Sequence, residues 1–161
     1  MEKLPLSTTL ETAKKHLREN YTKGVKCPCC DQFVKMYKRP ITSAMAYALI
    51  LFYKQYVGKE LKDITIHADK FFKTQDCPPS IRGDFPKLVY WGFLRKFDHC
   101  DGWYRLTESG RDFVQGKTSA PSHRLFYNNK CFGVPEDAKL ITIKDALKKK
   151  FDYEKLMNNT L

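Results

Sequence analysis

Three cysteines lie close together near the amino terminus, in the sequence Cys27-Pro28-Cys29-Cys30. Two thiolates separated by two residues in a tight turn can bind one metal ion, and structural Zn²⁺ takes such ligands at Zn–S distances of about 2.3 Å. Cys27 and Cys30 have this spacing, and Asp31 stands where zinc ribbons commonly have glycine. The spacing predicts a zinc knuckle in which Cys27 and Cys30 are ligands and Cys29 faces away.

A structural zinc ion needs four ligands, and the chain has no second Cys-x-x-Cys. The candidates for the remaining ligands are Cys77, His99, Cys100 and Cys131, followed by His67 and His123. The alternative is a reduced hairpin whose thiols are packed without a metal. The sequence leaves both interpretations open, and zinc would stabilise the fold without taking part in a reaction.

The motifs of common catalytic sites do not occur in the sequence. It contains no Gly-rich phosphate loop, no His-Glu-x-x-His, no Gly-x-Ser-x-Gly and no Asp-rich metal loop. None of the four histidines belongs to a recognisable motif with a nucleophile or a carboxylate. We therefore expect a protein that is not an enzyme.

The charge of the chain favours a polyanionic partner. Among 161 residues, 29 Lys and Arg outnumber 18 Asp and Glu, which gives a formal net charge of +11. The excess of basic residues is five in residues 1–40, three in 41–106 and three in 107–161, so it is spread along the chain. Nucleic acid is the first expected partner, ahead of an anionic membrane or an acidic protein.

The hydrophobic residues predict a folded protein of one core. They make up 42% of the chain, and 14% of the residues are aromatic. The longest apolar run, from Ala44 to Tyr53, is too short to span a membrane, and the first residues lack the apolar segment of a signal peptide. We expect a cytoplasmic protein with reduced thiols and no membrane partner.

Local patterns predict the elements that must position these residues. Thr8 and Glu11 resemble a capping box for a first helix that ends before Gly24. Thr42 or Ser43 can cap an almost wholly apolar helix that runs to Val57 and carries Leu49 and Phe52 on one stripe. This helix should be the central core helix or lie in a subunit interface. The other expected elements are a hairpin at 25–38, a strand at 64–66, helices at 68–74 and 85–91, strands at 93–97 and 103–106, a helix at 107–114, a hairpin at 124–132 and a helix from Thr142.

The segment KLVYWGFLRKFDHCDGWYRLTESGRDFV resembles the end of the winged-helix domain of prokaryotic regulators. Its Leu106-Thr107-x-x-Gly110 element has a physical explanation: the leucine fills the core, the threonine caps a helix, and the glycine allows close packing on the sheet. The resemblance covers residues 41–116. The added Cys-Pro-x-Cys knuckle also resembles small uncharacterised proteins of tailed bacteriophages, a likeness that implies no activity.

Together these features predict an α+β fold with three parts. Residues 1–40 would form an N-terminal helix and a zinc-knuckle-like β-hairpin, and residues 41–116 a winged helix-turn-helix core. Residues 117–161 would form a C-terminal hairpin and helical extension.

In a helix-turn-helix the second helix enters the major groove, and flanking residues contact phosphates. Here that helix is Phe85–Trp91, with Phe85, Leu88 and Val89 facing the core. The residues then expected to bind nucleic acid are Arg82, Lys87 and Tyr90 on and before the helix, and Arg95, Lys96 and Arg105 on the wing. Further basic candidates are His99, Lys117, His123 and Arg124.

The expected function is non-catalytic binding of double-stranded DNA by a regulatory protein of phage or prokaryotic origin, in the host cytoplasm if a phage encodes it. The acidic residues Asp84, Asp98 and Asp101 lie close to the expected interface and argue against it. The alternative is a protein-interaction module on a winged-helix scaffold that binds a host or viral protein. A homodimer is compatible with either function.

Overall fold

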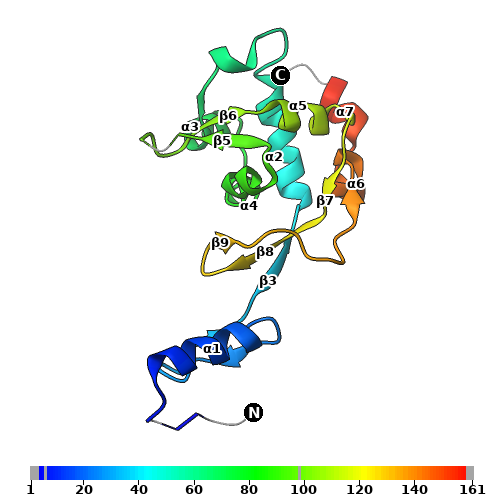
Figure 1. Ribbon diagram of the computed structural model, residues 1–161. Coiled ribbons are helices and arrows are strands. Elements are labelled where there is room, and N and C mark those ends of the chain that lie inside the picture. The colour runs from blue at the N-terminus through cyan, green and yellow to red at the C-terminus, as the bar shows by residue number, and fades with distance from the viewer. Residues whose placement is uncertain (1–3, 6, 98, 159–161) are drawn as a thin grey trace.

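The structure, a computed structural model that describes residues 4–5, 7–97 and 99–158, is mixed α+β, which confirms the expected fold class. It consists of a small amino-terminal module and a larger body (Figure 1). The module holds a helix and a short hairpin. Strand β3 (Tyr37–Pro40) leads from the module into the body, where it joins a sheet.

The amino-terminal module begins with helix α1 (Leu10–Asn20), whose cap is Thr9 and not the predicted Thr8. The Thr9 hydroxyl accepts a hydrogen bond from the amide of Thr12 at 3.3 Å. Strands β1 (Val25–Lys26) and β2 (Phe33–Val34) then pair antiparallel. The hairpin predicted at 25–38 is therefore correct around its turn and wrong beyond residue 34, because β3 pairs elsewhere.

The body contains most of the helices and three small antiparallel sheets. Its helices are α2 (Ser43–Lys54), α3 (Ala68–Thr74), α4 (Pro79–Arg82), α5 (Glu108–Val114), α6 (Ile143–Leu147) and α7 (Tyr153–Asn158), with 3-10 helices η1 (Leu61–Asp63), η2 (Phe85–Trp91) and η3 (Lys148–Lys150). Its further strands are β4 (Ile66–His67), β5 (Leu94–Lys96), β6 (Trp103–Leu106), β7 (Ala120–Pro121), β8 (His123–Tyr127), β9 (Lys130–Cys131) and β10 (Leu140–Ile141). The strand orders are β4-β6-β5, β3-β8-β9 and β10-β7. No helix of the described residues is long and apolar enough to cross a membrane.

Helix α2 forms the centre of the body, as its apolar sequence predicts. Thr42 caps it, accepting from the amide of Met45 at 3.2 Å, and it ends at Lys54, before the predicted Val57. Leu49 and Phe52 are fully buried, which confirms their core assignment. Helix α6 packs against α2 and adds its own buried residues, so the C-terminal segment shares this core.

The segment 85–91 is helical as predicted, but it is a 3-10 helix. Phe85, Leu88 and Trp91 are buried, and this spacing of three matches the three residues per turn of such a helix. Val89, predicted to face the core, is only partly buried, and Trp91 takes its place. Asp84 precedes the helix without capping it through its side chain.

The hydroxyl of Tyr56 joins two segments of the body inside the core. It accepts a hydrogen bond from the amide of Leu106 at 3.1 Å and donates one to the carbonyl of Ile64 at 3.3 Å. Burial raises the pKa of Tyr56, so the hydroxyl keeps the proton that it donates.

Tyr56→Phe should lower the free energy of unfolding by about 1–3 kcal/mol, because it leaves two backbone groups without their partner. Tyr90→Phe is a matched control, since the Tyr90 hydroxyl bonds to the carbonyl of Asn129 in an exposed position. Denaturant titration of both variants measures the difference. Equal effects would contradict the role assigned to Tyr56.

Candidate nucleic-acid interface and thiol knuckle

Two arginines face each other on the β5–β6 hairpin. Arg95 of β5 is the cross-strand partner of Arg105 of β6. Both guanidinium groups lie over the ring of Phe97, with distances from Cζ to the ring centroid of 5.7 Å for Arg95 and 5.1 Å for Arg105. Like charges in directly opposed positions repel. A bound anion between them would relieve that repulsion.

Arg105 is held in place more firmly than Arg95. Its Nη2 donates to the hydroxyl of Thr65 at 3.1 Å, and its Nε is buried with no hydrogen-bond partner among the described residues. Lys96, the next residue of β5, pairs with Asp101 at 3.2 Å, and the Asp101 side chain is almost fully exposed. Exposed ion pairs are weak, so a phosphate can replace this carboxylate at little cost.

The three residues predicted to bind nucleic acid on and before η2 all have partners within the chain. Arg82 pairs with Asp69 at 3.6 Å, and Lys87 pairs with Asp84 at 2.6 Å. Tyr90 packs its ring edge-on against Phe126 at 5.0 Å. The interface predicted from sequence is therefore partly occupied by side chains of this chain.

The sheet β3-β8-β9 lies beside the carboxyl end of η2. Figure 1 shows β8 and β9 next to the helical segment that includes α4, and the ring of Tyr90 of η2 packs on Phe126 of β8. Trp91 Nε1 donates instead to the carbonyl of Pro121 on β7, in the β10-β7 sheet, at 2.7 Å. The hydrogen bond from the Tyr90 hydroxyl to Asn129 reaches the turn of the β8–β9 hairpin. The carboxyl end of η2 thus contacts this sheet, and the sequence does not predict this contact.

A second pair of arginines lies in this sheet. Arg39 of β3 is the cross-strand partner of Arg124 of β8, and the Arg124 Nε is buried without a partner among the described residues. The sequence points to Arg124 but not to Arg39, because the predicted hairpin at 25–38 leaves no strand at Arg39 to pair with β8. The predicted candidates His123, on β8, and Lys117, after α5, lie outside the β5–β6 hairpin, and His99 lies in its loop.

The thiol knuckle, residues 27–31, is the turn between β1 and β2. The amide of Cys27 donates to the carbonyl of Gln32 at 2.8 Å, and the amide of Asp31 donates to the carbonyl of Cys27 at 2.9 Å. Asp31 has a φ of 56°, the left-handed conformation that glycine adopts readily. Hydrogen bonds from the backbone of Cys29 and Cys30 lower the pKa of the Cys27 thiol, whereas desolvation raises that of Cys29.

The other proposed zinc ligands belong to the body. Cys77 is buried in the core, and Cys131 lies on β9, where its Sγ is 4.0 Å from the carbonyl oxygen of Gly133. His67 packs edge-on against Trp103. His99 and Cys100 lie in the β5–β6 loop, and His123 lies on β8. Within the described part of the chain, no three His, Cys, Asp or Glu side chains form a group that could hold a metal ion.

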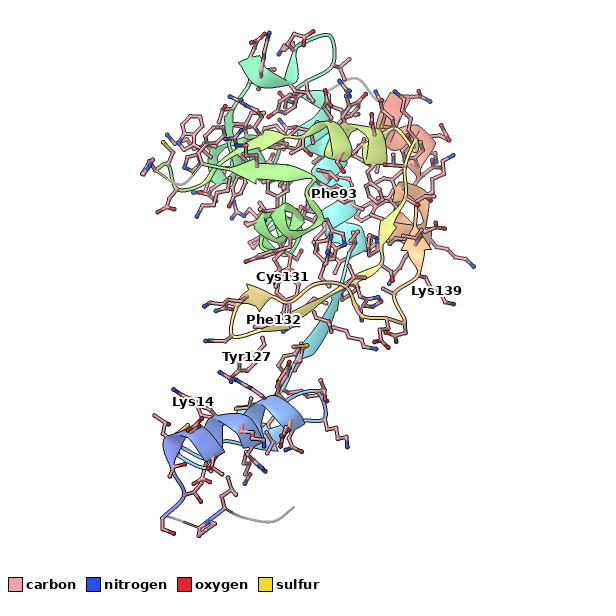
Figure 2. The ribbon with its side chains drawn as sticks, viewed as in Figure 1. Lys14, Phe93, Tyr127, Cys131, Phe132 and Lys139 are labelled. Atoms are coloured by element: carbon pink, nitrogen blue, oxygen red, sulfur yellow. The ribbon has the colours of Figure 1, made fainter. Side chains whose placement is uncertain are left out.

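An apolar groove of about 390 Å³ lies between α1 and the β8–β9 hairpin. In Figure 2, Tyr127 and Phe132 of this region lie above Lys14 of α1. The rings of Tyr21 and Tyr127 stack at a centroid distance of 6.0 Å. The groove is lined by Lys14, Leu17, Arg18, Tyr21, Val34, Tyr127 and Phe132. It is mostly aromatic and aliphatic, with two basic side chains from α1.

Comparison of the chain with family models, with curated proteins and with solved structures found no match.

Proposed function

We propose that this protein is a non-catalytic, regulatory DNA-binding protein of the winged-helix type, which binds double-stranded DNA mainly through the β5–β6 hairpin. In this proposal β5 and β6 are the wing, and α3 with the segment 79–91 is the helical pair. The single observation that carries the proposal is the pair of arginines, Arg95 and Arg105, over one aromatic ring.

The topology of the body supports a winged helix. Helix α2 is followed by β4, α3, the segment α4–η2, and the antiparallel strands β5 and β6. The first strand pairs with the last, which gives the order β4-β6-β5. This is the order that a winged helix-turn-helix produces when its wing folds back on the strand before the helical pair.

Electrostatics support a phosphate partner. The net charge of +11 attracts DNA from a distance, and the two guanidiniums present several N–H donors that match phosphate oxygens. Lys96 and Lys87 add positive charge once their exposed carboxylate partners are exchanged for phosphates. Arg82 and Tyr90 hold their places on and before η2 by contacts within the chain, so their roles are secondary in this proposal. Acting on DNA, the protein would work in the cytoplasm of a prokaryotic cell.

Salt dependence of DNA binding tests the proposal. If about five phosphates are neutralised, log K should fall with log[salt] with a slope of roughly −4 to −5. Arg95→Gln should reduce the magnitude of this slope by about one and weaken binding across sequences. Lys149→Gln removes the same charge from the exposed η3 and should have a smaller effect. Isotherms over a salt series measure both variants.

Equal losses from Arg95→Gln and Lys149→Gln would reduce the proposal to nonspecific attraction, and no binding at low salt would contradict it. The second candidate, a protein-interaction module, would then be favoured. Its support is the apolar groove between α1 and the β8–β9 hairpin, where Lys14 and Arg18 suit an acidic segment with apolar side chains. Saturable binding of such peptides, weakened by Phe132→Ser, would identify that function.

A further inference from the structure

We propose that the thiol knuckle forms a zinc site shared by two copies of the chain, in which each copy donates the thiolates of Cys27 and Cys30 to one ion. The site would join the amino-terminal modules of a symmetric dimer. This inference concerns a different part of the molecule from the proposed DNA interface, and it does not depend on DNA binding.

The donor set of one knuckle is half of a structural zinc site. Cys27 and Cys30 belong to a turn closed by backbone hydrogen bonds at both ends, so their spacing is fixed before any metal arrives. Structural Zn²⁺ takes four ligands in a tetrahedral arrangement. Two identical knuckles related by a two-fold axis through the ion supply four thiolates in that arrangement.

The knuckle is open to a second copy. Cys30 is exposed and Cys27 is partly exposed, so a ligand from another molecule can approach without unfolding the module. In contrast, two of the proposed ligands in the body are held by other contacts: Cys77 is in the core, and His67 packs on Trp103. Bringing them to the knuckle would cost those contacts.

An apolar side chain beside the knuckle would be buried by the same contact. Phe33 of β2 is the cross-strand partner of Lys26, the residue before Cys27, and its side chain is 60% exposed. Its ring lies against Gly24, where a Cβ would come within 2.5 Å of it. Burial of two Phe33 rings would stabilise the dimer in addition to the metal bonds.

An exposed lysine adjoins the knuckle in each copy and can offset part of the negative charge of four thiolates. A Zn²⁺ ion with four thiolate ligands carries a net charge of −2. Positively charged side chains nearby stabilise such a site, and carboxylates nearby destabilise it. Lys26 precedes the knuckle and Lys35 follows β2 in each copy, and Lys26 is exposed. In the β1–β2 register Lys26 adjoins the knuckle and Lys35 lies at the far end of the pairing, so each copy places one lysine beside the site, and the carboxylate of Asp31 is the opposing charge.

Metal titration of the full chain tests the inference. The protein is stripped with a chelator, kept in a non-thiol reductant and titrated with zinc chloride, while its mass is followed by light scattering after gel filtration. We expect half a zinc ion per chain at saturation and a doubling of mass that a chelator reverses. Co²⁺ in place of Zn²⁺ should give the strong absorption of a tetrahedral four-thiolate site.

Matched cysteine variants separate this site from other thiol effects. Cys30→Ser should abolish both metal binding and dimerisation, whereas Cys29→Ser, one residue away, should retain both. Circular dichroism shows whether each variant keeps its fold. One zinc ion per monomer, a dimer that forms without metal, or zinc retained by Cys30→Ser would each overturn the inference.

Discussion

Replacing Phe52 with alanine is expected to lower the free energy of unfolding by about 3–5 kcal/mol. Phe52 is fully buried on α2. Its ring meets Phe85 of η2 at 5.0 Å, Tyr56 at 5.6 Å and Phe71 of α3 at 5.9 Å between centroids. The substitution removes contacts with three segments at once and leaves a cavity that these rigid rings cannot fill. Leu49→Ala should cost about 2–5 kcal/mol for the same reason.

Denaturant titration with a constant m-value measures this loss. Val57→Ala is the control, because Val57 lies just beyond α2 and is 61% exposed; it should change stability by less than about 0.5 kcal/mol. Phe52→Leu keeps most of the volume and should cost less than Phe52→Ala. A loss below about 1 kcal/mol for Phe52→Ala would contradict the central place of the aromatic cluster.

The elements of the body that follow local patterns could be predicted from sequence. Thr42 caps an apolar run, and the predicted range 68–74 coincides with α3. The turn at Asn128 and Asn129 has positive φ at both residues, as its asparagines indicate, and β8 and β9 flank it. In each case the deciding interactions join residues that are close in sequence, so the local pattern contains them.

Strand β3 shows where local reasoning fails. Its alternating side chains suggested that residues 37 and 38 continue the hairpin that begins at Val25. Instead Tyr37 pairs with Phe126, far away in the sequence. Alternation predicts a strand but carries no information on its partner. Because the partner of β3 does not follow from its own sequence, the pairing of Arg39 with Arg124 could not be predicted.

The 3-10 form of η2 has a similar origin. Phe85, Leu88 and Val89 fit an α-helical face, and Phe85, Leu88 and Trp91 fit a 3-10 face, so the sequence permits both. The structure has the 3-10 helix, in which Trp91 is buried and its indole donates to the carbonyl of Pro121. A carbonyl from a later segment thus helps to decide the local conformation.

For the candidate site, the basic residues could be predicted from the sequence, but the partners of most of them could not. The hairpin register that opposes Arg95 and Arg105 follows from the predicted strands 93–97 and 103–106 and their turn. The ion pair of Arg82 with Asp69 is set by the packing of α4 on α3, whereas Lys87 and Asp84 are three residues apart and pair locally. These pairs, together with Tyr90 on Phe126, move the proposed main contact with DNA from η2 to the β5–β6 hairpin.

Gly110→Ala is expected to destabilise the protein by about 1–3 kcal/mol, although alanine is the better helix former by about 1 kcal/mol. Gly110 is buried in α5, and a Cβ there would overlap the carbonyl oxygen of Phe93 and lie 2.9 Å from Cδ1 of Leu106. The Phe93 carbonyl cannot move freely, because it also accepts the amide of Thr107 at 3.0 Å. The clash with backbone therefore outweighs the gain in propensity.

The neighbouring Ser109 provides the control for this last prediction. It is exposed in the same helix, so Ser109→Ala should change stability by no more than about 0.5 kcal/mol. Thermal or denaturant unfolding of the two variants separates the steric effect at Gly110 from a general effect of alanine in α5. If Gly110→Ala were neutral or stabilising, α5 would not pack on the backbone of Phe93 and on Leu106 as closely as the structure has it.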